Sequence, residues 1–188
     1  MSSGGGAQAR LLELLRSRSF ERKRVTLASG KESDFFIDCK QAVLTAEGHA
    51  LAGEVLLAAI AALPATVAVA GVELGGCPLA SAVALISFQR GVPLDAIYVR
   101  KDAKDHGSRR LLEGNARLAP GARVALLEDV VTTGGSTLRA AARLSEAGYE
   151  VVGVVALVDR LEGGREAIEA GGLRLVAIFT RADFMGPA

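Results

Sequence analysis

Residues 124–141, VALLEDVVTTGGSTLRAA, combine in order a short apolar run, two adjacent acids, a turn rich in Thr and Gly, and a segment rich in Ala. An apolar run that is short and stops at charged residues is typical of a buried strand in a parallel sheet. A helix is expected to follow over residues 136–147, because Ser136 and Thr137 are good N-cap residues and Gly148 ends the helical pattern. The acids and the turn therefore lie where a strand passes into a helix, which is where open α/β sheets bind their ligands.

The rest of the chain repeats this alternation of strand and helix. Extended segments are expected at residues 66–70, 95–99, 123–128, 151–158 and 173–179, and helical spacing is found at residues 7–18, 45–62, 78–90 and 164–170. Such an order predicts an α/β fold with a central, mostly parallel sheet of about five strands flanked by helices. Two short extended segments around a Gly-containing turn come earlier, within residues 24–40, and predict a small N-terminal hood over residues 7–45.

The length and composition limit the classes of function. A chain of 188 residues is the size of one domain, residues 1–188, in which residues 1–6 (MSSGGG) are expected to be flexible. The net charge of +1 argues against a nucleic-acid partner and favours a small molecule.

No apolar segment reaches the roughly 18 residues that span a bilayer, and no signal peptide is recognised, so we expect a cytoplasmic protein without a membrane partner. Cys39 and Cys77 are far apart and are expected to be free, buried thiols.

The turn of residues 130–136, VVTTGGS, suits a phosphate group. Hydroxyls and backbone N–H groups at a helix N-terminus form a cradle for an anion, although the sequence is neither a P-loop nor a GxGxxG fingerprint. Glu128 and Asp129 would repel a phosphate, so they are better suited to sugar hydroxyls or a divalent cation. A phosphorylated sugar would satisfy both halves, and the alternative interpretation is an acidic turn before an ordinary capped helix.

A second basic motif, RKDAKDHG, occupies residues 100–107 within a long polar break at residues 100–120. Its cationic side chains suit a polyanion such as pyrophosphate. A solvated surface loop is the alternative, which the neighbouring phosphate motif makes less attractive. The basic residues of this motif are Arg100, Lys101, Lys104 and His106.

The two motifs together resemble a known family. VALLEDVVTTGGST resembles the motif with which type I phosphoribosyltransferases bind 5-phosphoribosyl 1-pyrophosphate (PRPP), and RKDAKDHG is similar to the catalytic loop of the orotate phosphoribosyltransferase family within that group. The resemblance extends from LASGKESDFFID to LVDRLEGG, which is most of the chain. It implies a type I phosphoribosyltransferase fold and the transfer of a phosphoribosyl group from PRPP to orotate in pyrimidine synthesis, giving orotidine 5′-phosphate and pyrophosphate. Mg²⁺ would be bound mainly through PRPP rather than by a metal site of the protein.

The resemblance also implies roles for individual residues. Lys101, Lys104, His106 and Asp129 are the implied catalytic residues, and Arg100 would join the first three at the pyrophosphate. Orotate would meet Thr132 and Arg160, with Phe35 and Phe36 beside the base. In the PRPP motif, the acids would hold the ribose hydroxyls and residues 132–136 the 5-phosphate; its implied substrate-binding positions are Glu128, Asp129, Val130, Val131, Thr132, Thr133, Gly134, Gly135 and Ser136.

The resemblance implies in addition a homodimer whose loop closes over the neighbouring subunit's site. The chain departs from the family pattern at Ala28, Leu74 and Gly75, where some members have cationic or aromatic residues, so pyrophosphate would depend more on Mg²⁺ and on the backbone N–H groups of residues 73–76. Asp38 and Lys40 are interpreted as a pair across an exposed turn. Two other functions stay open: a purine phosphoribosyltransferase, and a regulatory protein that senses PRPP with the same fold.

Overall fold

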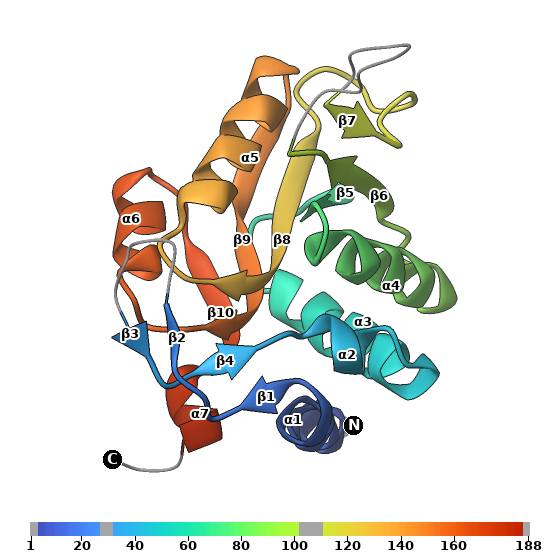
Figure 1. Ribbon diagram of the computed structural model, residues 1–188. Helices are drawn as coiled ribbons and strands as arrows, with labels where there is room; N and C mark the ends of the chain where they lie inside the picture. The colour runs from blue at the N-terminus through green and yellow to red at the C-terminus, as the bar shows by residue number, and fades with distance from the viewer. Residues whose placement is uncertain (1–3, 27–31, 102–110, 186–188) are drawn as a thin grey trace, which may run out of the picture.

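The computed structural model describes residues 4–26, 32–101 and 111–185. Its central sheet has six strands in the order β10-β9-β8-β5-β6-β7, all parallel to their neighbours except β7, which runs antiparallel to β6 (Figure 1). The mostly parallel α/β architecture is therefore confirmed. The strands are β5 (Ala68–Val72), β6 (Asp95–Val99), β7 (Leu112–Glu113), β8 (Arg123–Val131), β9 (Glu150–Asp159) and β10 (Leu175–Thr180).

The sixth strand corrects the expected number of about five. β7 consists of two residues that pair with Tyr98 and Val99 of β6, inside the break expected at residues 100–120. A strand of two residues has no periodicity to recognise, so only its pairing partner defines it.

Helices cover both faces of the sheet. α3 (Ala46–Ile60) and α4 (Gly76–Gln89) pack on one face, and α5 (Gly135–Glu146) and α6 (Gly164–Ala170) on the other (Figure 1). Successive side chains of a strand point to opposite faces, so Ala125 and Leu127 of β8 join the core beneath α3 and α4, while Val124 and Leu126 join the core beneath α5 and α6. This two-sided burial explains why the strands read as continuous apolar runs.

The hood is built from short elements before residue 45. Strands β1 (Phe20–Glu21) and β4 (Phe36–Ile37) pair with each other, as do β2 (Val25–Thr26) and β3 (Glu32–Ser33), and both pairs are antiparallel. The C-terminal helix α7 (Arg181–Met185) completes the hood, because the ring of Phe184 packs against those of Phe20 and Phe35 at centroid distances of 5.7 Å. The two ends of the described chain thus share one aromatic cluster.

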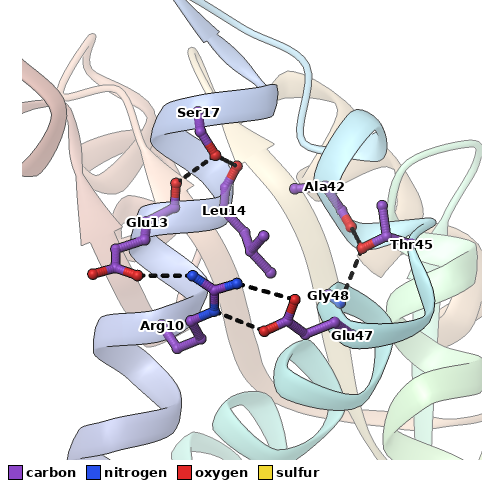
Figure 2. Close-up of polar contacts among 8 residues, drawn as sticks. All are labelled: Arg10, Glu13, Leu14, Ser17, Ala42, Thr45, Glu47 and Gly48. Atoms are coloured by element: carbon purple, nitrogen blue, oxygen red, sulfur yellow. Dashed lines mark hydrogen bonds and ion pairs between the residues drawn. The ribbon is translucent and has the colours of Figure 1, made fainter.

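Two helices connect the hood to the sheet. α1 (Gly4–Arg18) begins three residues before Ala7, the expected start, so Gly4, Gly5 and Gly6 belong to this helix. The guanidinium of Arg10 donates to both carboxylate oxygens of Glu47 on α3, at 2.7 and 3.2 Å (Figure 2). Short helix α2 (Lys40–Val43) leads into α3, whose N-cap Thr45 accepts the N–H of Gly48 at 3.0 Å (Figure 2).

Candidate active site

The two acids of the PRPP-like motif lie at the carboxyl end of β8. This strand continues to Val131, three residues beyond the expected end at residue 128, so both carboxylates project from the strand itself rather than from a turn. Consecutive strand residues face opposite sides of a sheet. Glu128 and Asp129 therefore have different surroundings and different partners.

Glu128 is buried beneath the first turn of α5. Its Oε1 accepts hydrogen bonds from the hydroxyls of Thr137, at 2.8 Å, and Ser136, at 3.2 Å. The expected capping role of these two residues is wrong: the N-cap is Gly134, whose φ of 78° lets the chain turn sharply into the helix. Burial raises the pKa of Glu128 to about 7, and the neighbouring charge of Asp129 acts in the same direction.

Glu128→Gln is expected to flatten the pH dependence of the free energy of unfolding. The unfolded chain releases this proton near the usual pKa of 4.5, whereas the folded chain retains it up to about 7. The free energy of unfolding therefore falls by about 3 kcal/mol as the pH rises from 4.5 towards 7. Gln does not ionise, and its amide oxygen can still accept from Thr137. Urea unfolding at about pH 5 and about pH 8 measures the difference, and an equal fall in both proteins would contradict the assignment.

Asp129 faces the loop that joins β5 to α4. Its Oδ1 accepts the N–H of Val130 at 2.9 Å, and its side chain lies so close to Gly75 that a Cβ there would be 1.9 Å from Oδ2. Burial raises the pKa of this carboxyl above its ordinary value. The glycine at position 75, which departs from the family pattern, is therefore required by the approach of Asp129.

Both acids line a cavity of about 260 Å³ at this edge of the sheet. Lys40 and Lys101 contribute the cationic side chains of its wall. The expected ion pair between Lys40 and Asp38 is present at 2.6 Å, but the place of Lys40 in the site is not predicted from the sequence. The local pattern could not show this, because α2 comes close to β8 only through the fold. The remaining lining residues are Val72, Glu73, Leu74, Gly75, Val130 and Ser136.

The basic motif begins at the end of β6. The N–H of Lys101 donates to Oε2 of Glu73 at 2.8 Å, which fixes the start of the motif beside the β5–α4 loop. The N–H of Arg100 donates to the carbonyl of Leu111 at 2.9 Å, so the described residues on either side of positions 102–110 are hydrogen-bonded to each other. Lys104 and His106 lie outside the described residues, so their roles stay predictions.

The Thr- and Gly-rich turn connects β8 to α5 above this cavity. Thr132 is half-buried and Thr133 is exposed. Gly134 is buried, and a Cβ on it would lie 2.9 Å from the carbonyl oxygen of Gly164. The first N–H groups of a helix have no acceptor within that helix, so the start of α5 presents donors towards the turn. This arrangement suits the phosphate predicted from the sequence.

Arg160 follows β9, the strand next to β8, and its backbone N–H donates to the carbonyl of Val131 at 3.0 Å. Its Nη2 donates to the carbonyl of Phe35, at 2.9 Å, and lies 2.9 Å from a carboxylate oxygen of Glu162. Nε is buried and has no hydrogen-bond partner among the residues that the structure describes. The N–H at Nε is therefore a donor that a ligand could use.

The two aromatic residues expected beside the base differ from each other. The ring of Phe35 is fully buried in the aromatic cluster of the hood, so it supports the site from behind, contrary to the interpretation that places it beside the base. Phe36 is half-buried, and the ammonium of Lys23 lies 4.0 Å from its ring centroid. Phe35 was misplaced because a Phe-Phe pair does not indicate which ring faces the core.

Within residues 4–26, 32–101 and 111–185, His, Cys, Asp and Glu form no group of three or more that could hold a metal ion. None of the helices in the described part of the chain is long and apolar enough to cross a membrane. Cys39 and Cys77 are buried free thiols, as expected.

Comparison with known proteins identifies the family. Residues 52–172 match the model of the phosphoribosyl transferase domain. The chain is 68% identical over 184 residues to the orotate phosphoribosyltransferase of Sorangium cellulosum, covering 98% of this chain and 96% of that protein. An identity of this size over nearly the whole of both chains extends beyond the shared PRPP motif.

Solved structures agree with the sequence relatives. The orotate phosphoribosyltransferase of Mycobacterium tuberculosis, in complex with Fe(III) dicitrate, is 41% identical with a TM-score of 0.81, and the match covers 95% of this chain and 99% of that one. The same enzyme in complex with PRPP is 39% identical with a TM-score of 0.77, covering 95% of this chain and 98% of that one. Similarity therefore includes the fold and the elements that build the cavity.

Proposed function

We propose a mechanism from one premise: the chain belongs to the orotate phosphoribosyltransferase family of type I phosphoribosyltransferases. It is an enzyme that transfers the phosphoribosyl group of PRPP to orotate, giving orotidine 5′-phosphate and pyrophosphate in pyrimidine synthesis. The observation that carries the mechanism is the cavity that Asp129 and Lys101 line together with Ser136 of the first turn of α5.

The phosphate and ribose of PRPP would occupy the β8–α5 end of the cavity. Donors at the start of α5 and in the turn of residues 132–136 would bind the 5-phosphate. Asp129 is the acid with a free face towards the cavity, so we assign the ribose hydroxyls to it. Glu128 accepts hydrogen bonds from the hydroxyls of Ser136 and Thr137. Through these two residues it would hold the phosphate-binding turn in place.

Pyrophosphate would leave towards the cationic wall. Lys101 and Lys40 lie there, together with the backbone of residues 73–75. We infer a transition state in which positive charge develops on the ribose before the new bond forms, so that Asp129 stabilises the ribose and the lysines stabilise the leaving group. Arg100, Lys104 and His106 are proposed to complete the pyrophosphate contacts.

Orotate would lie between Thr132, Phe36 and Arg160. Arg160 is held by the hood through Phe35, and its buried Nε donates to none of the described residues, so a carboxylate could accept from it. This assignment distinguishes orotate from purine bases, which have no carboxylate.

Arg160→Lys is expected to raise the KM for orotate by about tenfold or more while the KM for PRPP changes much less, because Lys lacks the planar fork. Steady-state kinetics with each substrate varied in turn measures the two constants. Arg174→Lys, on an exposed arginine before β10, is the matched control. Equal changes in both KM values would assign Arg160 to the structure of the hood.

Mg²⁺ fits the oxygen donors of this site. Asp129 lines the cavity with a carboxylate whose ionised form is disfavoured by burial, and a cation nearby would relieve that cost. Asp129, and Glu73 across the cavity, are the residues that we propose to lie beside the ion. Mg²⁺ brought by PRPP would neutralise charge on the pyrophosphate.

The activity is tested with purified protein, orotate, PRPP and Mg²⁺, following orotate consumption with and without a chelator. We expect turnover with orotate that the chelator abolishes, and none with adenine or hypoxanthine in its place. Turnover with a purine would favour the purine enzyme, and PRPP binding without turnover of any base would favour the regulatory protein.

A homodimer in the cytoplasm is proposed as the working form. On α4, Leu85 and Phe88 are 53% and 73% exposed, and Tyr98 of the adjacent strand β6 is also exposed. Apolar side chains grouped in this way suit a contact between two copies of the chain. Lys101 lines the cavity of its own chain, so residues 102–110 are the part that could reach a neighbouring site.

Co-refolding Lys104→Ala with Asp129→Asn tests whether sites are shared. Random pairing makes about half of the dimers mixed. If Lys104 serves the neighbouring subunit, each mixed dimer has one intact site of two, so about a quarter of wild-type activity should return. Mixing the folded variants without subunit exchange is the control and should restore nothing. Mixed dimers as inactive as either parent would place Lys104 in its own subunit's site.

A further inference from the structure

Arg143, in the last turn of α5, reaches across to the end of β6. Its Nη1 donates to the carbonyl of Arg100, and its Nη2 donates to the carbonyl of Lys101 at 2.6 Å. Two carbonyls of successive residues are thus bound by one planar guanidinium. Arginine binds paired acceptors in this way because its N–H groups form a rigid fork.

Lys101 is fixed at its other backbone group as well. Its backbone N–H donates to the carboxylate of Glu73 at 2.8 Å, so Glu73 and Arg143 together bind the backbone N–H and the backbone carbonyl of Lys101. The two side chains come from elements far apart in sequence, the β5–α4 loop and α5. The backbone of Lys101 is therefore fixed relative to both of these elements.

The same helix presents the phosphate-binding end of the cavity. Ser136 lines the cavity and lies seven residues before Arg143, which is close to two helical turns and places both on one face of α5. Lys101 lines the same cavity as Ser136 and the two acids. Arg143 thus joins the part of the site that suits the 5-phosphate to the part that suits pyrophosphate.

We propose that Arg143 is a positioning residue that sets the place of Lys101 relative to the phosphate-binding end of α5. The inference rests on the proposed function, because it assigns the pyrophosphate to Lys101. A lysine has a long side chain with many rotamers, so holding its backbone lowers the entropy lost when its ammonium meets the leaving group. No contact between Arg143 and a substrate is required.

Arg143→Ala tests this role through ligands that fill different parts of the cavity. Calorimetric titration should show PRPP binding about tenfold more weakly, while ribose 5-phosphate, which lacks the pyrophosphate, binds within about twofold of wild type. The kcat with orotate should fall by about 10- to 100-fold. Low millimolar guanidinium should restore part of the kcat, because the ion can occupy the space between the two carbonyls.

The controls separate positioning from folding. Arg117→Ala removes an exposed arginine from the β7–β8 connection and should match wild type in every measurement. Arg143→Lys retains a charge but not the fork, so its kcat and PRPP affinity should be intermediate, and it serves as the test if the Ala variant does not fold. Melting temperatures of all variants report the folded state.

Two outcomes would overturn the proposal. Unchanged PRPP affinity and kcat in Arg143→Ala would show that Lys101 does not depend on the contact. If Arg143→Ala lost affinity for ribose 5-phosphate and for PRPP equally, and guanidinium did not restore kcat, Arg143 would be a structural residue of α5. Absence of turnover with orotate in wild type and in Arg117→Ala would instead contradict the proposed function, and the two binding titrations would still decide the role of Arg143.

Discussion

Gly75→Ala is expected to lower kcat/KM for PRPP by about 100-fold or more while the protein remains folded. A Cβ at this position would lie 1.9 Å from Oδ2 and 2.1 Å from Cγ of Asp129, far inside van der Waals contact. The backbone of Gly75 has φ of −66° and ψ of −32°, which alanine adopts without strain. The conflict therefore falls on the Asp129 side chain, which must leave the position from which it faces the cavity.

Kinetics with PRPP and the melting temperature together check this prediction. Gly5→Ala on α1 is the matched control, because a Cβ there meets nothing within 4 Å and alanine favours a helix. We expect the control to retain full activity. If Gly75→Ala bound PRPP as well as wild type does, the present position of Asp129 would not matter for PRPP.

Asp129→Asn is expected to weaken PRPP binding and to reduce turnover, with a combined loss of about 100-fold in kcat/KM. The substitution keeps the shape of the side chain and removes the negative charge that would face the ribose hydroxyls and Mg²⁺. Stability should not fall, because burial already disfavours the ionised form of this carboxyl and raises its pKa. Asp95→Asn, on an exposed acid at the opposite end of the sheet, is the control.

The two substitutions should also be strongly non-additive. Both act through the carboxylate of Asp129, so the double variant should lose little more activity than either single variant. Additive losses would mean that Gly75 and Asp129 serve separate steps. Retained PRPP affinity in Asp129→Asn alone would remove Asp129 from the ribose site.

Local sequence was sufficient for the order of the longer strands of the central sheet and of the helices that cover it. The apolar run before Glu128 and the Ala-rich segment after Thr137 each carry a periodicity that depends only on near neighbours, and both elements form as expected. The same holds for the strand at residues 95–99 and the helix at residues 164–170, whose bounds agree with the structure. The PRPP-like motif also depends on adjacent residues, so its place at a strand end could be recognised.

Partners distant in sequence were decided by the tertiary structure alone. Lys40 enters the cavity because α2 packs near β8, Arg143 reaches the end of β6 from another element, and the ring of Phe35 turns into the aromatic cluster that Phe184 completes. Sequence periodicity indicates which face of an element is buried, but not which element covers it. The type of structure and the place of the PRPP-like motif at a strand end therefore followed from the sequence. The second lysine of the cavity, the different surroundings of the two acids and the backbone contacts of Lys101 required the long-range packing that brings these residues together.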